Sequence, residues 1–215
     1  MREIDMSKHV AFDENDIKLI LSGHKTQFRK VVYGNGWNPN DGVLDSVAAN
    51  FKKSIGIQAF FAMSDGLNIG TKFPYGLVGD VLWVQEKHAR LEKENRFTKP
   101  HYFADGGLSL RDRHDAGLLR SYPAYLMPKW ASRINIQITK VRVEKLQQIS
   151  LNDLRQEGGV AVINNRIGTN FGKPIEENLI NDFAKSWNES TNAKFGDTWE
   201  TNPYVWVVDF EVIKK

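Results

Sequence analysis

The spacing of apolar positions along the chain predicts three helices. Residues 13–22 form the first, with apolar side chains at helical intervals and Asp13 as its cap. Residues 150–157 form a short second helix, because a Ser-x-x-Asp capping pair opens it and two glycines follow. Apolar positions between residues 175 and 187 mark one face of a longer third helix.

Runs of continuous or alternating apolar residues predict the strands. One strand covers residues 81–89 after a Gly-Asp turn, and residues 97–104 are its candidate hairpin partner. The last strand, residues 203–213, is apolar on both faces over its first half. We therefore expect it to lie inside the sheet, with a strand on each side.

The clearest strand, residues 131–145, changes phase part-way along. Isoleucines at positions 134, 136 and 138 share one face, whereas valines at 141 and 143 follow in the opposite phase. A slip of one residue moves every side chain to the other face, so a straight strand cannot keep both sets in one core. We predict a bulge or a sharp bend near Thr139-Lys140, a device that small barrels use to close.

Polar segments separate these elements. Two of them, about residues 34–73 and about residues 105–126, are rich in glycine, asparagine or charge and are predicted to be insertions. A strand-rich chain with three peripheral helices is expected to be α+β. We predict a single domain over residues 1–215, built as a partly closed β-barrel with these loop insertions.

The composition indicates where the protein is located and which kinds of site it cannot contain. Among 215 residues, 41% are hydrophobic, which is enough for a packed core, and the formal net charge of +3 is only mildly basic. There is no cysteine, so disulfides and thiolate metal sites are excluded. No run of eighteen apolar residues occurs, so we expect no membrane association and a cytoplasmic location.

Four segments, in this order, resemble the ASCH (activating-signal-cointegrator homology) domains that are common in bacteriophage and prophage genomes. The first has the family's I-x-x-G-x-K-T pattern, the second its G-D-x-L-W-V-x-E strand, and the last its closing strand. They are ILSGHKTQFRKVV (Ile20 to Val32), PYGLVGDVLWVQEKHA (Pro74 to Ala89), residues 127–158, and NPYVWVVDFEVI (Asn202 to Ile213).

The resemblance implies a PUA-like barrel with a cleft between the barrel and the helices, and RNA or a modified nucleoside as the partner. Some small ASCH proteins remove an acetyl group from acetylated cytidine nucleosides with a lysine, a threonine and a glutamate. These positions fall on Lys25, Phe28 and Glu157, and Lys25 and Glu157 are the candidate catalytic pair. Phenylalanine has no nucleophilic oxygen, so Thr26 is the nearest candidate hydroxyl.

Cations beside aromatic side chains are the usual means of holding single-stranded nucleic acid, because cations neutralise phosphates and indole faces stack on bases. Trp130 lies between two cations, and Trp37 and Trp199 lie in polar loops where they could also stack. The residues expected on the floor of one cleft are Lys25, Arg29, Glu86, Trp130, Arg133 and Glu157. Lys129 is a further candidate for binding nucleic acid.

Two other functions stay open. A metal-independent ribonuclease could use His24, Lys25 and Glu157 for acid–base chemistry and phosphate stabilisation. A phage accessory protein could instead bind a host protein through its glycine- and asparagine-rich insertion. The five histidines have no metal-ligand spacing, and nucleotide-binding glycine motifs are absent, so no metal and no cofactor are expected.

Overall fold

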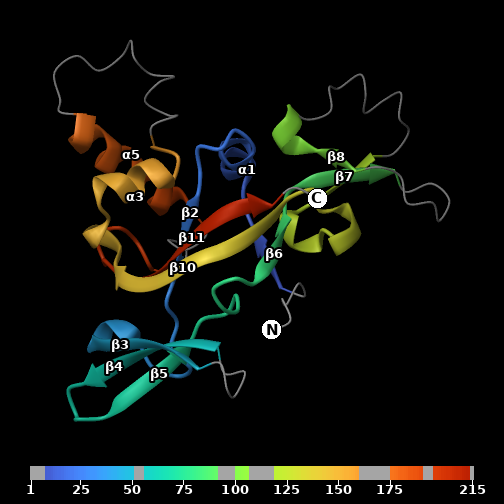
Figure 1. Cartoon of the computed structure of the whole chain (residues 1–215). Helices are drawn as coiled ribbons and strands as arrows, with labels where there is room; N and C mark the ends of the chain where they lie inside the picture. Colours follow the sequence, from blue (N-terminus) through green and yellow to red (C-terminus); the bar gives the residue numbers. More distant parts are fainter. Residues whose placement is uncertain are drawn as a thin grey trace.

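The computed structural model describes residues 8–50, 56–91, 100–106, 119–159, 175–190 and 196–213. Most of these residues form strands in three sheets, with few helices (Figure 1). The α+β class predicted from the sequence is therefore confirmed. The largest sheet is open among the described strands, since its order runs from one edge strand to another and the two edges do not pair.

The central sheet has five strands, and all neighbours are antiparallel except the first pair. In spatial order these are β1 (His9–Ala11), β6 (Val81–Gln85), β10 (Asn135–Lys145), β11 (Tyr204–Ile213) and β2 (Gln27–Val31). As predicted, β11 lies inside the sheet and is buried on both faces. Val205 and Val207 pack with Trp187, whereas Trp206 and Val208 belong to the main core with Phe61.

The first insertion is a folded sheet. It contains a 3-10 turn at Pro39–Asp41 and the antiparallel strands β3 (Gly42–Asn50), β4 (Gly56–Met63) and β5 (Asn68–Lys72). Ile57, Ala59 and Phe61 alternate along β4 and are buried in the main core, so the insertion covers part of the central sheet. This sheet lies apart from the helices in Figure 1.

The predicted strand over residues 81–89 is two strands in different sheets. After β6 the chain turns at Glu86-Lys87 and continues as β7 (His88–Leu91), which pairs with β8 (His101–Tyr102) and β9 (Leu119–Tyr122). Of the expected hairpin partner, residues 97–104, His101 and Tyr102 form β8 and pair with β7, while residues 97–99 lie outside the described residues. Of the second insertion, residues 107–118 lie outside the described residues. Short 3-10 turns cover Phe103–Asp105, Ala124–Leu126 and Lys129–Ala131.

All three predicted helices are present: α1 (Glu14–Leu21), α3 (Leu151–Gln156) and α5 (Ile175–Glu189). The Asp13 side chain accepts a hydrogen bond from the backbone N–H of Asp16 at 2.8 Å, and Ser150 and Asp153 form the predicted capping box of α3. A 3-10 turn at Leu146–Gln148 joins β10 to α3. None of the helices that the structure describes is both long and apolar enough to cross a membrane.

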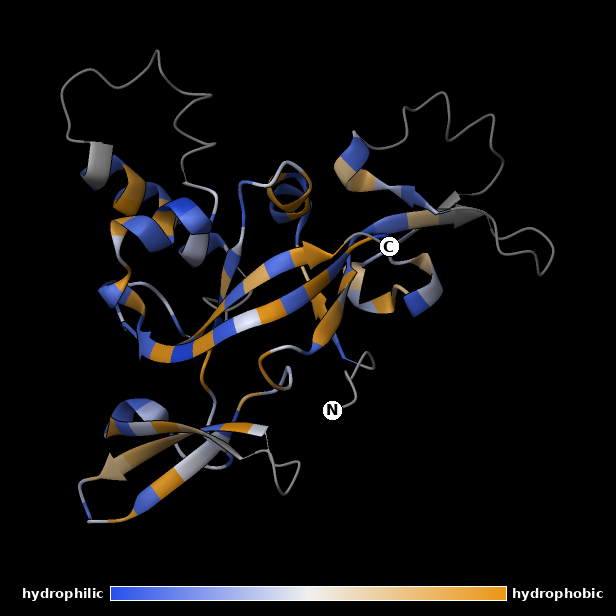
Figure 2. Cartoon of the chain, viewed as in Figure 1, coloured by the Kyte–Doolittle hydropathy of each residue, from blue (hydrophilic) through white to orange (hydrophobic). Residues whose placement is uncertain are grey.

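The predicted irregularity of β10 is confirmed. Its pairing with β11 shifts between Ile138 and Lys140, which leaves Thr139 as an extra, exposed residue. Beyond this β-bulge, Val141 and Val143 return to the face that Ile138 occupies, and all three contact the main core. The alternation of polar and apolar residues along β10 is visible in Figure 2.

Deleting Thr139 should be tolerated, because the remaining sequence then alternates without interruption and keeps Val141 and Val143 inward. We expect a loss of about 1–2 kcal/mol in the free energy of unfolding, measured with urea. Deleting Gln137 instead should turn Ile138 outward and Thr139 inward, at a cost of about 3 kcal/mol or more. Equal losses for both deletions would show that the bulge does not set the phase.

Candidate functional site: a cleft between α1, β2 and α5

One face of strand β2 is buried but carries polar side chains, although buried strand faces are usually apolar. Gln27 and Arg29 alternate along this strand and are both buried, and Lys25 precedes them with the same period. Phe28 lies between them and packs into the main core. Because buried polar groups need partners, this face of β2 has to meet hydrogen-bond acceptors from the rest of the fold.

Arg29 lies at the centre of these contacts, with only 1% of its side chain exposed. Its Nη1 donates to Gln27 Oε1 at 2.6 Å and to Glu157 Oε1 at 2.8 Å. Its Nη2 donates to Glu144 Oε1 at 2.9 Å and lies 3.5 Å from Asp153 Oδ2. The guanidinium is thus neutralised by three carboxylates that come from β10 and α3.

A second arginine, Arg142 of β10, contacts two of the same carboxylates, Glu144 and Asp153. It contacts Asp153 at 2.6 Å, Glu144 at 2.9 Å and Asp209 of β11 at 3.5 Å. Burial would raise the pKa of Asp153, but hydrogen bonds from Gln27, Ser150 and Arg142 outweigh it and hold this pKa well below its usual range. Asp153 is therefore ionised, although it caps a buried helix start.

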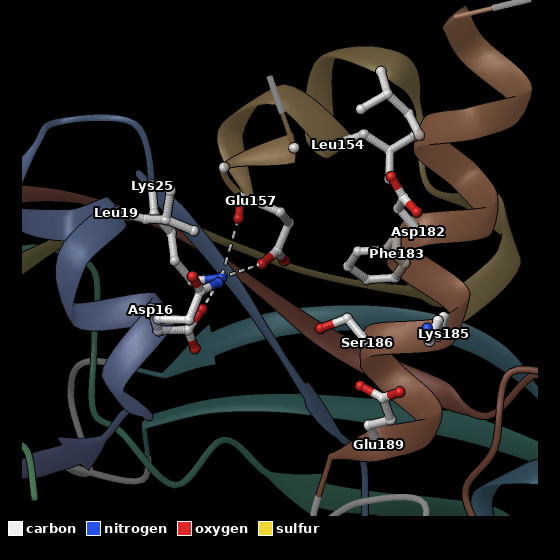
Figure 3. A pocket seen from close by; sticks show the side chains of 14 residues that line it. Asp16, Leu19, Lys25, Leu154, Glu157, Asp182, Phe183, Lys185, Ser186 and Glu189 are labelled. Atoms are coloured by element: carbon white, nitrogen blue, oxygen red, sulfur yellow. Dashed lines mark hydrogen bonds and ion pairs between the residues drawn. The ribbon is translucent and has the colours of Figure 1, made fainter. Parts of the chain in front are cut away.

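Lys25 and Glu157 meet at the edge of this network, as the resemblance implied (Figure 3). The ammonium Nζ lies 2.6 Å from Glu157 Oε2 and 3.1 Å from Asp16 Oδ1, and both side chains of the Lys25–Glu157 pair are buried. Burial opposes the positive charge, but the attraction of Glu157 and Asp16 is stronger and raises the pKa of Lys25. Lys25 is consequently an ammonium in this structure.

The turn after α3 fixes Glu157 in place. Glu157 is the C-cap residue of α3, and the following Gly158 has a φ of +94°, in the left-handed region that favours glycine. A Cβ at Gly158 would lie 2.7 Å from the Leu19 side chain of α1. The close approach of these two elements sets the Glu157 carboxylate beside Lys25.

The Lys25–Glu157 pair lines a cleft between α1, β2 and α5, which we call the α1–β2–α5 cleft. Two adjoining cavities of about 340 Å³ and about 670 Å³ make up this cleft and share Asp16, Lys25, Glu157 and Phe183. Figure 3 shows Ser186 and Glu189 of α5 opposite Lys25 and Asp16. The larger cavity is also bordered by Phe12, Asp13, Phe28, Arg29, Lys30 and Trp187.

The prediction that one cleft floor holds all the candidate residues is wrong. Arg133 pairs with Glu86 at 2.8 Å and with Asp105 at 2.7 Å, and its guanidinium carbon stacks 4.0 Å from the centre of the Tyr102 ring. None of these residues lines the cavities that hold Lys25. The physical reason is the turn at Glu86, which takes the chain from the central sheet into the β7–β9 sheet.

The three tryptophans expected to stack on bases lie in different environments. Trp130, next to the exposed Lys129, is 46% exposed, as a stacking residue has to be. Trp37 instead packs on Phe61 with ring centres 5.4 Å apart, and Trp199 packs against Phe183. The polarity of their loops did not reveal that these loops fold back onto apolar surfaces.

Phe28, at the position of the family's threonine, is buried among aromatic rings. Its ring lies 5.4 Å from Phe12, 5.7 Å from Tyr75 and 5.9 Å from Phe210 between centres. Thr26 is half-buried, and its backbone is hydrogen-bonded to Gln156 and Phe210. Because Lys25 is already protonated, it cannot serve as the general base for a hydroxyl.

Several residues of the site had no recognised signal in the sequence. Asp153 was expected only as a helix cap, and Glu144, Arg142 and Asp209 alternate with apolar residues as solvent-facing strand residues do. The one available signal was the polar, period-two pattern of Lys25, Gln27 and Arg29. In the described segments no group of three or more histidine, aspartate or glutamate side chains has the geometry to hold a metal ion.

No protein-family model matches the sequence, and no match was found among curated proteins or solved structures. The likeness to ASCH domains therefore rests on the four sequence segments alone.

Replacing Arg29 by methionine should leave Glu144, Asp153 and Glu157 without their shared counter-charge. We expect a loss of about 3–5 kcal/mol in the free energy of unfolding at pH 7, measured with urea. Lys87→Met is the matched control, because the Lys87–Glu14 pair is 3.1 Å long but over 40% exposed on both sides, and it should cost at most about 1 kcal/mol. Similar small losses for both variants would contradict a stabilising role for the buried network.

Proposed function

We propose that this protein binds a small, uncharged modified nucleoside in the α1–β2–α5 cleft, as an ASCH-like protein with PUA-like ancestry. The observation that carries this proposal is the buried Lys25–Glu157 pair in a cleft with cavities of about 340 and 670 Å³. Small-molecule sites in proteins commonly have volumes of about 300–1,000 Å³.

The charges of the cleft favour a nucleoside over an RNA strand. A phosphate backbone needs cations that are free to replace its counterions. Lys25 and Arg29 are already paired with carboxylates, and Arg29 is buried, so the expectation that Arg29 contacts phosphate is not supported. Carboxylates at the cleft can accept hydrogen bonds from sugar hydroxyls and base amino groups, and Phe12, Phe183 and Trp187 provide apolar surface.

The same geometry favours binding without hydrolysis. A lysine acting as general base has to lose its proton near neutral pH, whereas the pKa of Lys25 is raised by Glu157 and Asp16 against the effect of burial. The nucleophile position is taken by the buried Phe28. The deacetylation that the resemblance suggests therefore stays the second choice for this cleft.

Calorimetric titration with N4-acetylcytidine tests the proposal, with acetate release followed in parallel. We expect binding without acetate release, and a loss of at least about tenfold in affinity for Ser186→Trp, which fills the cleft from α5. Asn181→Trp is the control, because Asn181 is exposed on the same helix and lines neither cavity. Equal affinity of both variants would place the nucleoside elsewhere, and rapid acetate release would make the protein an amidohydrolase.

A second candidate function is single-stranded RNA binding at the surface around Trp130. Tyr125 is 72% exposed and Trp130 46% exposed, and the exposed Lys129 is adjacent to Trp130. Exposed aromatic faces beside a cation are the components of a base-stacking surface.

Trp130→Ala and Tyr125→Ala should each weaken binding of a labelled oligouridylate by about 1–3 kcal/mol in a fluorescence-anisotropy titration. Lys129→Ala should reduce the slope of log affinity against log salt by about 0.7 if this lysine neutralises one phosphate. Tyr33→Ala, which removes a 56% exposed tyrosine from the segment after β2, is the control and should have no effect. Wild-type protein that fails to bind at low salt would end this candidate.

A further inference from the structure

Lys30 differs from the other cations of the α1–β2–α5 cleft. Lys25 and Arg29 contact carboxylates at 2.6–2.9 Å, whereas the side-chain ammonium of Lys30, the next residue of β2, forms no hydrogen bond or ion pair with any residue that the structure describes. Lys30 is nevertheless half-buried and borders the larger cavity, beside Phe28. Neither the nucleoside proposal nor the ion-pair network uses it.

Several charged groups besides Lys30 border the cavity around it. They are Asp13 and Asp16 at α1, Lys25 and Arg29 at β2, Glu157 at the end of α3, and Glu189 of α5. Burial lowers the pKa of Lys30 and the Lys25 ammonium lowers it further. Asp16, Glu157 and Asp13 act in the opposite direction without reversing the shift.

An amine in this position has the properties of a nucleophile. A partly buried ammonium with no carboxylate in direct contact is destabilised relative to the neutral amine, and a desolvated lysine beside another cation is one of the known ways to obtain a reactive amine. The cavity of about 670 Å³ gives room for a reactant at the same place. Lys30 is therefore a partly buried lysine whose ammonium has no ion pair with the described residues and which borders a cavity large enough for a reactant.

We propose that Lys30 is a nucleophilic amine that forms an imine with a carbonyl-bearing ligand held in the α1–β2–α5 cleft. The neutral nitrogen attacks the carbonyl carbon and forms the new C–N bond. The carbonyl oxygen then leaves as water with the two hydrogens of the amine, so that no oxidant or reductant takes part. The proposal goes beyond nucleoside binding and does not depend on it.

The carboxylates of the cleft favour an uncharged carbonyl compound over a phosphate or carboxylate ligand. Besides Lys30, the cavity is bordered by four carboxylates and by only two cations, Lys25 and Arg29, so the excess negative charge would repel an anion that approached Lys30. A neutral aldehyde or ketone meets no such repulsion. Its oxygen can also accept a hydrogen bond before the attack.

Reductive alkylation of the intact protein with benzaldehyde and cyanoborohydride at pH 7 tests the proposal, with modified lysines quantified by peptide mass spectrometry. We expect Lys30 to react faster than the exposed Lys18 and Lys140, because burial lowers its pKa and so raises its neutral fraction. The paired Lys25 should remain unmodified. As the pH is raised, the rate at Lys30 should level off at a lower pH than the rate at Lys18.

Two variants separate the cleft from general reactivity. Lys30→Arg should abolish the modified peptide and leave Lys18 unchanged. If that variant does not fold, Ser186→Trp keeps Lys30 and narrows the cleft, and it should slow modification of Lys30 alone. A rate at Lys30 equal to or below that at Lys18 in the wild-type protein would overturn the proposal, and so would an unchanged Lys30 rate in Ser186→Trp. Failure to bind N4-acetylcytidine would leave it standing.

Discussion

A guanidinium inside a protein has to be neutralised, and the position of Arg29 imposes this requirement on the rest of the structure. Its counter-charges come from Glu144 of β10 and from Asp153 and Glu157 of α3, so strand, helix and helix cap all have to meet at one point. Arg142 contacts two of the same carboxylates. The whole network contains three cations and five carboxylates, the latter being Asp16, Glu144, Asp153, Glu157 and Asp209. Such a network fixes geometry more than it adds stability, because desolvation offsets much of the attraction.

This constraint also shapes the chemistry of the cleft. Cations that hold the fold together are not available for a phosphate backbone, and this supports the proposal of an uncharged ligand for the cleft. The ion pairs of Lys25 with Glu157 and Asp16 keep Lys25 protonated, so it cannot act as a general base. Lys30, the next residue of β2, borders the same cavity but its ammonium forms no ion pair with the carboxylates that the structure describes. Neighbouring cations in the sequence thus have opposite chemical characters, because Arg29 forms ion pairs with the described carboxylates and Lys30 does not.

Local features of the fold could be predicted from the sequence because local physics determines them. The caps at Asp13 and Ser150 and the bulge at Thr139 depend only on nearby residues and on the phase of one strand. The meeting of Lys25 and Glu157 came from the family resemblance instead. The split between Lys25 and Arg133 could not be foreseen, because it depends on the turn at Glu86 that separates β6 from β7. The burial of Trp37 likewise depends on the insertion folding into a sheet against the main core.

The residues that line the cleft come from distant parts of the chain. Lys25 and Glu157 are 132 positions apart, and Glu157 takes its place only when α3 has docked on β2 and α1. No fragment of the chain that lacks either region can contain this site, so the site belongs to the cooperatively folded molecule as a whole. A ligand bound there would therefore stabilise the native state globally, by RT ln(1 + [L]/Kd), and a cell that accumulates the ligand would also accumulate more of the folded protein.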